Sequence, residues 1–242
     1  MTMSSDSAEF LQKGALYKMQ KRKIVIGTYD TALEGLWTLT NWSLGRAEPR
    51  ESFVEVPGHN GPLDLSTVLT DGEPYYGSRE FTATLESSEG TRLEREERIN
   101  RMINQLDGWR HNIILPDDPE HYINGRVRIE KLYNDPAHAS VRVTATCDPW
   151  RYNNSETVVG LIASDTEQVV ALLNVGRRSV VPNITVTGGD VTIIFNTGTE
   201  ERTWVLSPGE YILADIYLKT GSAPLRYRGK GYVTLTYREA VL

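Results

Sequence analysis

The chain has 242 residues, of which 39% are apolar, with a net charge of −6 and a sequence pI of about 5.4. This length suffices for one large domain or two small ones. The acidic balance argues against broad nucleic-acid binding, which needs a basic face. The single cysteine, Cys147, excludes an intramolecular disulfide. We expect neither a signal peptide nor a membrane span, because no apolar run approaches the ~18 residues that a span needs.

The N-terminal part of the sequence predicts a β structure. Residues 1–20 are polar and lack periodicity, so we expect a loose arm or a short capping segment. The runs that alternate apolar and polar residues, or are short and β-branched, predict strands at 23–29, 36–44, 51–56 and 79–87. The basic run from Lys18 to Lys23 is expected to be a solvated edge that discourages edge-to-edge association. Its alternative role is contact with a nucleic-acid backbone or an acidic neighbour.

Residues 91–107 predict one helix. Its apolar side chains fall largely on one stripe, formed by Leu93, Ile99, Met102, Ile103 and Leu106. Thr91 and Glu94 have the spacing of a capping box. Asp107 and Gly108 are expected to end the helix, because glycine takes the left-handed conformation without a Cβ clash. The charged run 94–98 is expected to be a solvated face.

The rest of the chain predicts strands almost throughout. Three strand-like runs occupy 110–116, 122–133 and 138–149, and Pro149 is expected to end the last one because it cannot continue a ladder. Seven more runs occupy 157–163, 168–174, 179–188, 190–196, 202–207, 210–218 and 231–242. Their regular spacing, with turn residues between them, is typical of an antiparallel sandwich or barrel. We therefore predict a mainly β chain with one or two helices, divided into domains at 1–150 and 151–242.

One stretch, residues 116–127, concentrates groups that could bind a metal or transfer protons. Asp117, Asp118, Glu120 and His121 lie within five positions. A structural zinc site needs His or Cys pairs from two separated segments. An EF-hand loop needs a glutamate at its twelfth position, where this stretch has Arg128. The stretch is therefore predicted to be a connection between two strands.

Other catalytic patterns are also missing from the sequence. There is no G-x-S-x-G elbow, and the "RGKG" run at 228–231 lacks the spacing and the Ser/Thr of a phosphate-binding loop. Cys147 falls on the apolar side of an alternating strand and is expected to be a buried thiol. The four histidines include no pair at helical spacing. We predict no catalytic, cofactor-binding or metal-binding residue, no cofactor, and a protein that is not an enzyme.

Several short motifs follow one another in a fixed order, namely Arg79-Glu80-Phe81, Asp107-Gly108, Asp117-Asp118-Pro119, Tyr122, Gly125-Arg126, Cys147-Asp148-Pro149-Trp150 and the passage 174–195. This order resembles that of the distal tail protein (Dit) family of long-tailed phages. The resemblance covers roughly residues 60–240. It implies an N-terminal β domain that forms a hexameric ring and a C-terminal galectin-like β-sandwich. The chain has no room for the inserted carbohydrate-binding module of some family members.

The resemblance also implies a function. The ring would be a structural hub at the distal end of a long non-contractile tail, and the protein would be made in the host cytoplasm. Its partners would be copies of itself, the tail tube protein, and a fibre, lysin-type or baseplate protein of the tail tip. Genome DNA would cross the ring without specific binding, and no membrane would be involved. Whether one ring or two stacked rings form is left open.

Two further questions concern aromatic residues. A ring contact needs apolar anchors, and Tyr75, Tyr76 and Trp109 are candidates, with membership of the intramolecular core as the alternative. The alternative function is a carbohydrate-binding β-sandwich that aids host adsorption. Its candidates are Trp204 and Tyr217, although burial is the default for both. Whether the last run, 231–242, stays in the second domain is also left open.

Overall fold

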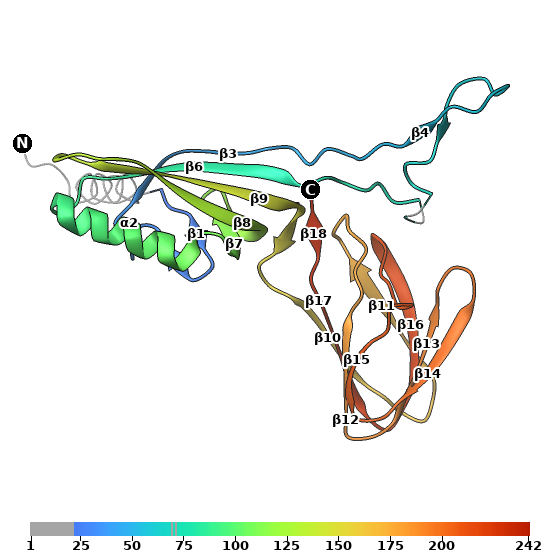
Figure 1. Cartoon of the computed structure of the whole chain (residues 1–242). Helices are drawn as coiled ribbons and strands as arrows, with labels where there is room; N and C mark the ends of the chain where they lie inside the picture. The colour runs from blue at the N-terminus through green and yellow to red at the C-terminus, as the bar shows by residue number, and fades with distance from the viewer. Residues whose placement is uncertain (1–21, 69, 71) are drawn as a thin grey trace, which may run out of the picture. The chain divides into compact units, whose positions relative to one another are not determined.

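A computed structural model describes residues 22–68, 70 and 72–242. These residues form two compact units (Figure 1). The first contains residues 22–119 and 123–149, and the second contains 120–122 and 150–242. The segment 1–20, for which a loose arm was predicted, lies outside the described residues. Within the described part, no helix is both long enough and apolar enough to cross a membrane.

The first unit is built on a large antiparallel sheet in the order β2-β1-β7-β8-β9-β6-β3. Its strands are β1 (Val25–Ile26), β2 (Tyr29–Asp30), β3 (Thr38–Leu44), β6 (Arg79–Ser87), β7 (Arg110–Leu115), β8 (Asp118–Asn134) and β9 (Ala139–Asn153). Two short strands, β4 (Phe53–Val54) and β5 (Leu63–Asp64), form a separate ribbon. The predicted strand 23–29 is thus two strands joined by a tight turn.

Strand β6 shows why one face of this sheet is buried. Phe81, Ala83 and Leu85 are buried and lie opposite Ala145, Val143 and Val141 of β9. The residues between them point to the other face, since successive side chains of a strand alternate. The predicted alternation of β6 is confirmed, and the apolar face forms the core of the first unit.

The single helix described, α2 (Arg92–Leu106), covers that apolar face. Ile99, Met102 and Leu106 are buried in the same core as the strands. Thr91 and Glu94 form the predicted capping box, and Gly108 has a φ of 80° just after the helix. The prediction for Leu93 was wrong: it is 69% exposed, because the buried stripe runs through Arg95, Ile99, Met102 and Leu106 and leaves Leu93 on another side of the helix.

Arg95 is a second departure from the prediction, which placed residues 94–98 on a solvated face. Its side chain is buried, and its guanidinium donates to three backbone carbonyl oxygens. Nη1 lies 2.5 Å from Gly90 O, and Nη2 lies 2.7 Å from Asp135 O and 3.1 Å from Pro136 O. The arginine thus joins the start of α2 to the turn between β8 and β9.

The second unit is a sandwich of two four-stranded antiparallel sheets, in the orders β10-β17-β12-β15 and β11-β16-β13-β14. The strands are β10 (Thr157–Ile162), β11 (Gln168–Asn174), β12 (Asn183–Thr187), β13 (Val191–Asn196), β14 (Glu201–Leu206), β15 (Gly209–Ile212), β16 (Gly221–Gly229) and β17 (Tyr232–Tyr237). Both sheets contribute to one core. The predicted sandwich is confirmed, and the run 210–218 is a strand only up to Ile212.

Strand β16 was missed by the prediction. It lies between β11 and β13, and Leu225 and Tyr227 point into the core. Pro224 obscured it, because proline cannot donate to a ladder. Pro224 lies opposite Ala171 of β11. The ladder with β13 begins one residue later, at Leu225, so β13 does not need an N–H from residue 224.

Pro149 also lies inside a strand, against the prediction that it would end one. The pairing of β9 with β6 ends at Cys147. The last strand, β18 (Ala240–Val241), then pairs with Tyr152 and Arg151. Pro149 falls between these two partners, so neither β6 nor β18 needs the N–H that proline lacks. The run 231–242 is thus divided between β17 in the sandwich and β18 on β9.

We predict that Arg95→Leu lowers the free energy of unfolding by about 1.5–3 kcal/mol, because the carbonyls of Gly90, Asp135 and Pro136 lose the charged donor that the buried guanidinium provides. Urea unfolding followed by tryptophan fluorescence measures this loss. Arg101→Ala is the control, since Arg101 is exposed on the same helix. Equal stability of the two variants would contradict a structural role for the Arg95 contacts.

Candidate functional site

The acidic stretch at 117–121 is mostly strand rather than connection. A turn at Pro116 and Asp117 joins β7 to β8, and Asp118, Glu120 and His121 already belong to β8. The prediction of a longer connection was wrong, because the turn needs only two residues. Within the described ranges, no group of three or more His, Cys, Asp or Glu side chains is placed to hold a metal ion.

Glu120 and His121 belong to the second unit, where the neighbouring Tyr122 is held by a stack of side chains. The rings of Tyr122 and Tyr152 stack with centroids 5.5 Å apart. Arg238 lies 5.5 Å from the Tyr122 ring, and Arg178 lies 5.8 Å from the Tyr152 ring. These contacts fasten the start of β8 to the end of β9. The stretch is therefore an attachment point within the second unit.

The lone thiol has the character of a core residue. Cys147 is buried, and burial raises its pKa to about 11. Because the thiolate is the nucleophile, the group is unreactive near neutral pH, and the predicted buried thiol is confirmed. The "RGKG" run at 228–231 is the end of β16 and the turn into β17.

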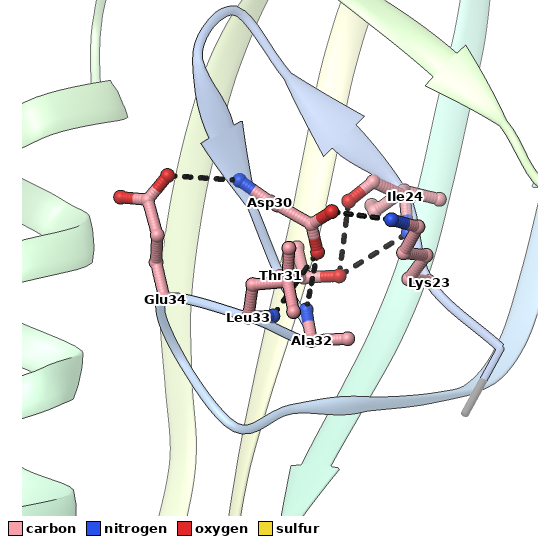
Figure 2. Close-up of polar contacts among 7 residues, drawn as sticks. All are labelled: Lys23, Ile24, Asp30, Thr31, Ala32, Leu33 and Glu34. Atoms are coloured by element: carbon pink, nitrogen blue, oxygen red, sulfur yellow. Dashed lines mark hydrogen bonds and ion pairs between the residues drawn. The ribbon is translucent and has the colours of Figure 1, made fainter. Parts of the chain in front are cut away.

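Part of the basic run is described, from Arg22 onward. Lys23 is not simply solvated, because its Nζ lies 2.5 Å from Asp30 Oδ2 (Figure 2). Asp30 Oδ1 also accepts from the backbone N–H groups of Ala32 and Leu33, at 3.0 and 3.1 Å. Burial raises the pKa of the Asp30 carboxyl, but these hydrogen bonds outweigh burial and hold that pKa below its ordinary value. Asp30 and Lys23 thus organise the turn that follows β2.

The candidate anchors differ in exposure. Trp109 is 67% exposed and Tyr75 is 54% exposed, so core membership is wrong for these two. Tyr76 is half-buried. The guanidinium of Arg50 lies 5.5 Å from the centroid of the Tyr75 ring. Tyr75 lies in the long segment between β3 and β6, which is the largest feature without a core of its own.

We call residues 45–78 the arm. None of its described residues is buried. Seven large apolar side chains are exposed on it, namely Phe53, Val54, Val56, Leu63, Leu65, Val68 and Tyr75. The predicted strand 51–56 is reduced to β4, whose two residues are both exposed. A large exposed apolar surface marks a binding site for another macromolecule.

The two limbs of the arm are nevertheless held together by backbone hydrogen bonds. Phe53 pairs with Asp64 and Val54 with Leu63. Nearer the sheet, Arg50 N donates to Tyr75 O at 2.7 Å, and Gly77 N donates to Glu48 O at 2.8 Å. Figure 1 shows the limbs continuing from β3 and β6 as an extended ribbon. The arm has a defined backbone, but its large apolar side chains stay exposed in the described part of the chain.

The face of the large sheet that points away from the core is polar. Thr82 lies opposite Thr144, and Glu80 lies opposite Thr146. Its arginines are partly neutralised by carboxylates: Arg110 lies 2.6 Å from Asp148, and Arg142 lies 3.2 Å from Glu130. Glu80, Arg126 and Arg128 line a shallow depression there. This face suits contact with water rather than a dry interface.

The two aromatic candidates for sugar binding both pack into the second unit. Trp204 of β14 is half-buried against the sandwich core. Tyr217 lies between β15 and β16 and not in a strand, and its hydroxyl donates to Thr197 O at 3.4 Å. Burial, the default for both residues, describes their positions better than an open sugar platform.

Comparison with solved structures identifies the fold as that of a phage distal tail protein. A scan against protein-family models and a search of curated proteins each find no match. The fold is therefore recognised from the arrangement of the backbone. The predicted fold, mainly β with a helix in the first part and a sandwich in the second, is confirmed.

The solved structure in question is the Dit protein of phage SPP1, described as a hub adsorption apparatus of phages that infect Gram-positive bacteria. The TM-score is 0.62, and the match covers 89% of this chain and 98% of the SPP1 chain. Sequence identity is 15%. The chain thus has a Dit-like fold over nearly the whole length of SPP1 Dit.

We predict that Asp30→Asn costs about 1 kcal/mol of unfolding free energy at pH 7, because the ion pair with Lys23 is lost while the turn can still accept from Ala32 and Leu33. A depressed pKa contributes stability above the unfolded value of about 3.9 and loses it as pH falls through the folded pKa. The difference from the parent protein should therefore begin to shrink below about pH 4 and vanish once the pH has fallen below the folded pKa of Asp30.

Denaturant unfolding at a series of pH values measures this difference. Asp165→Asn is the matched control, since Asp165 lies 4.0 Å from Lys230 with both side chains largely exposed. A difference between Asp30→Asn and the parent that stays constant down to pH 2 would contradict the role of the carboxylate.

Proposed function

We propose that this protein is a structural hub at the distal end of a long non-contractile phage tail, where copies of the chain form a hexameric ring. The observation that carries the proposal is the arm, whose large apolar side chains are exposed among the residues that the structure describes. The Dit-like fold supports the setting. In this proposal the protein is not an enzyme.

A ring requires two different surfaces on each copy, because neighbours related by rotation meet through unlike patches. The arm supplies one of them, and we infer that the first unit of the adjacent copy supplies the other. Trp109 lies at the end of the helix region and is exposed enough to belong to that second surface. Burial of seven apolar side chains would favour association by about 1.5 kcal/mol or more for each one that becomes fully covered.

The remaining partners follow from the same proposal. One side of the ring binds the tail tube protein, and the other side binds a fibre, lysin-type or baseplate protein. The polar face of the large sheet suits the wall of the channel, because its paired arginines and carboxylates would let DNA pass without specific binding. Residues 151–242 form the outer, galectin-like domain of the hub, and the protein resides in the virion tail.

The arm is tested by the double substitution Phe53→Glu and Leu63→Glu. We expect the unmodified chain to form annular particles whose mass is a multiple of six chains. The variant should remain dissociated, because charges in an apolar contact are costly to desolvate. Its unfolding midpoint should stay unchanged, since neither residue contacts the core. Light scattering and negative-stain images measure the assembly.

Leu93→Glu is the matched control, because Leu93 is an exposed apolar residue outside the arm. This variant should assemble as the unmodified chain does. A monomeric unmodified chain at high concentration, also when tail tube protein is present, would overturn the hub proposal. Normal rings from the arm variant would show that the arm is not the contact surface.

A further inference from the structure

The sandwich of the second unit has two open sides that differ in charge. Strands β10 and β15 are the edge strands of one sheet, and β11 and β14 are the edge strands of the other. Because connections of only five and two residues join β10 to β11 and β14 to β15, each of these pairs lies on one side of the sandwich. Strand β14 carries Glu201 and Arg202, and β15 carries Glu210. Strands β10 and β11 contain no charged residue and no proline. Edge strands usually carry such residues because they block pairing with another chain.

The uncharged strands also expose apolar side chains. Val158 and Ile162 of β10 are 62% and 67% exposed, and Val169 and Leu173 of β11 are 64% and 53% exposed. These residues lie on the outer faces of their sheets, beside strand edges that have no neighbour among the described strands. One side of the sandwich therefore offers two adjacent edges that are both apolar and unprotected.

The two strands share a pattern that is symmetric about its centre. The sequence around β10 is T-V-V-G-L-I-A, centred on Gly160, and that of β11 is Q-V-V-A-L-L-N, centred on Ala171. Residues at equal distances before and after each centre are similar in size, and the four inner ones are apolar. In β10, for example, Val159 corresponds to Leu161 and Val158 to Ile162. An antiparallel pair of such strands with the centres opposed would therefore match like with like at each apolar position.

We propose that the second unit binds a second copy of itself across a two-fold axis, with β10 pairing with β10 and β11 with β11 of the other copy. Each four-stranded sheet then continues into the partner as one eight-stranded sheet. Val158 lies beside the partner's Ile162, and Gly160 lies beside its own counterpart. A Cβ added at Gly160 would meet nothing within 4 Å, so the centre of β10 is open to close approach.

The two centres lie where a single axis can serve both strands. Gly160 is two residues before the end of β10, and Ala171 is three residues after the start of β11. A short connection, residues 163–167, joins the two strands, so both centres are at a similar distance from it. The charged side formed by β14 and β15 cannot replace a copy of β10 and β11, because Glu201, Arg202 and Glu210 would face apolar side chains.

This contact goes beyond the ring contact of the proposed function. It is isologous, so it joins pairs of copies, whereas the contacts between neighbours in a ring are heterologous. In an assembled hub, the contact would join two rings. In a chain that forms no ring, it would still produce a dimer. The two proposals therefore fail independently.

The first test is the double substitution Val158→Lys and Ile162→Lys in the full chain. Because both residues are exposed, the variant should fold normally, and sedimentation velocity should show half the mass of the unmodified assembly. Val205→Lys on β14 is the matched control, since Val205 is 71% exposed on the opposite side. The control should keep the unmodified mass. An unchanged mass of the double variant would overturn the two-fold contact.

The second test is crosslinking through Gly160→Cys, which does not depend on tolerance of lysines. In an antiparallel pair, opposed Cα atoms are about 4.5–5.5 Å apart, which is within disulfide range. Mild oxidation should give a covalent dimer of Gly160→Cys and of Ala171→Cys, whereas Val205→Cys should stay monomeric on a non-reducing gel. Crosslinking of Gly160→Cys no greater than that of Val205→Cys would overturn the proposal.

Discussion

The long strands described in both units bury one apolar face, and the need to cover that face organises the rest of the structure. In the first unit, α2 covers the face, and Ile99, Met102 and Leu106 share a core with β6 and β9. In the second unit, a second sheet covers it. Among the described residues, the arm and the outer sides of β10 and β11 leave apolar side chains exposed. These two surfaces are therefore the ones that we propose as contacts between copies of the chain.

Much of the fold can be predicted from local patterns. The alternation in residues 79–87 reports a buried face, since only one side of β6 packs inward. Thr91 and Glu94 act on each other three residues apart, so the start of α2 is visible in the sequence. Arg95 could not be predicted, because its acceptors include carbonyls about forty residues further along the chain. The predictions at Pro224 and Pro149 were wrong for a related reason. Whether the missing N–H of a proline disrupts a sheet depends on where the neighbouring strands begin and end their pairing.

The candidate surfaces are harder to predict than the fold. The run 51–56 alternates as a half-buried strand does, yet both residues of β4 are exposed because no second layer covers them. Alternation of apolar and polar residues indicates which side chains of a strand share a face. Whether another element packs on that face depends on segments elsewhere in the chain. The acids at 117–121 illustrate the converse. Their density is conspicuous in the sequence, but the structure assigns that stretch to a tight turn and the start of β8.

The stack of Tyr122 and Tyr152 has a practical consequence for fragments of this protein. Residues 120–122 belong to the second unit although the flanking residues belong to the first. A truncated fragment that starts at residue 151 would lose Tyr122, leaving Tyr152 and Arg238 each without a partner that the intact chain provides. The second unit is therefore not one continuous segment of the chain, and a single cut does not release it whole. Its excision requires the short peptide of β8 to be supplied separately or spliced to its new N-terminus.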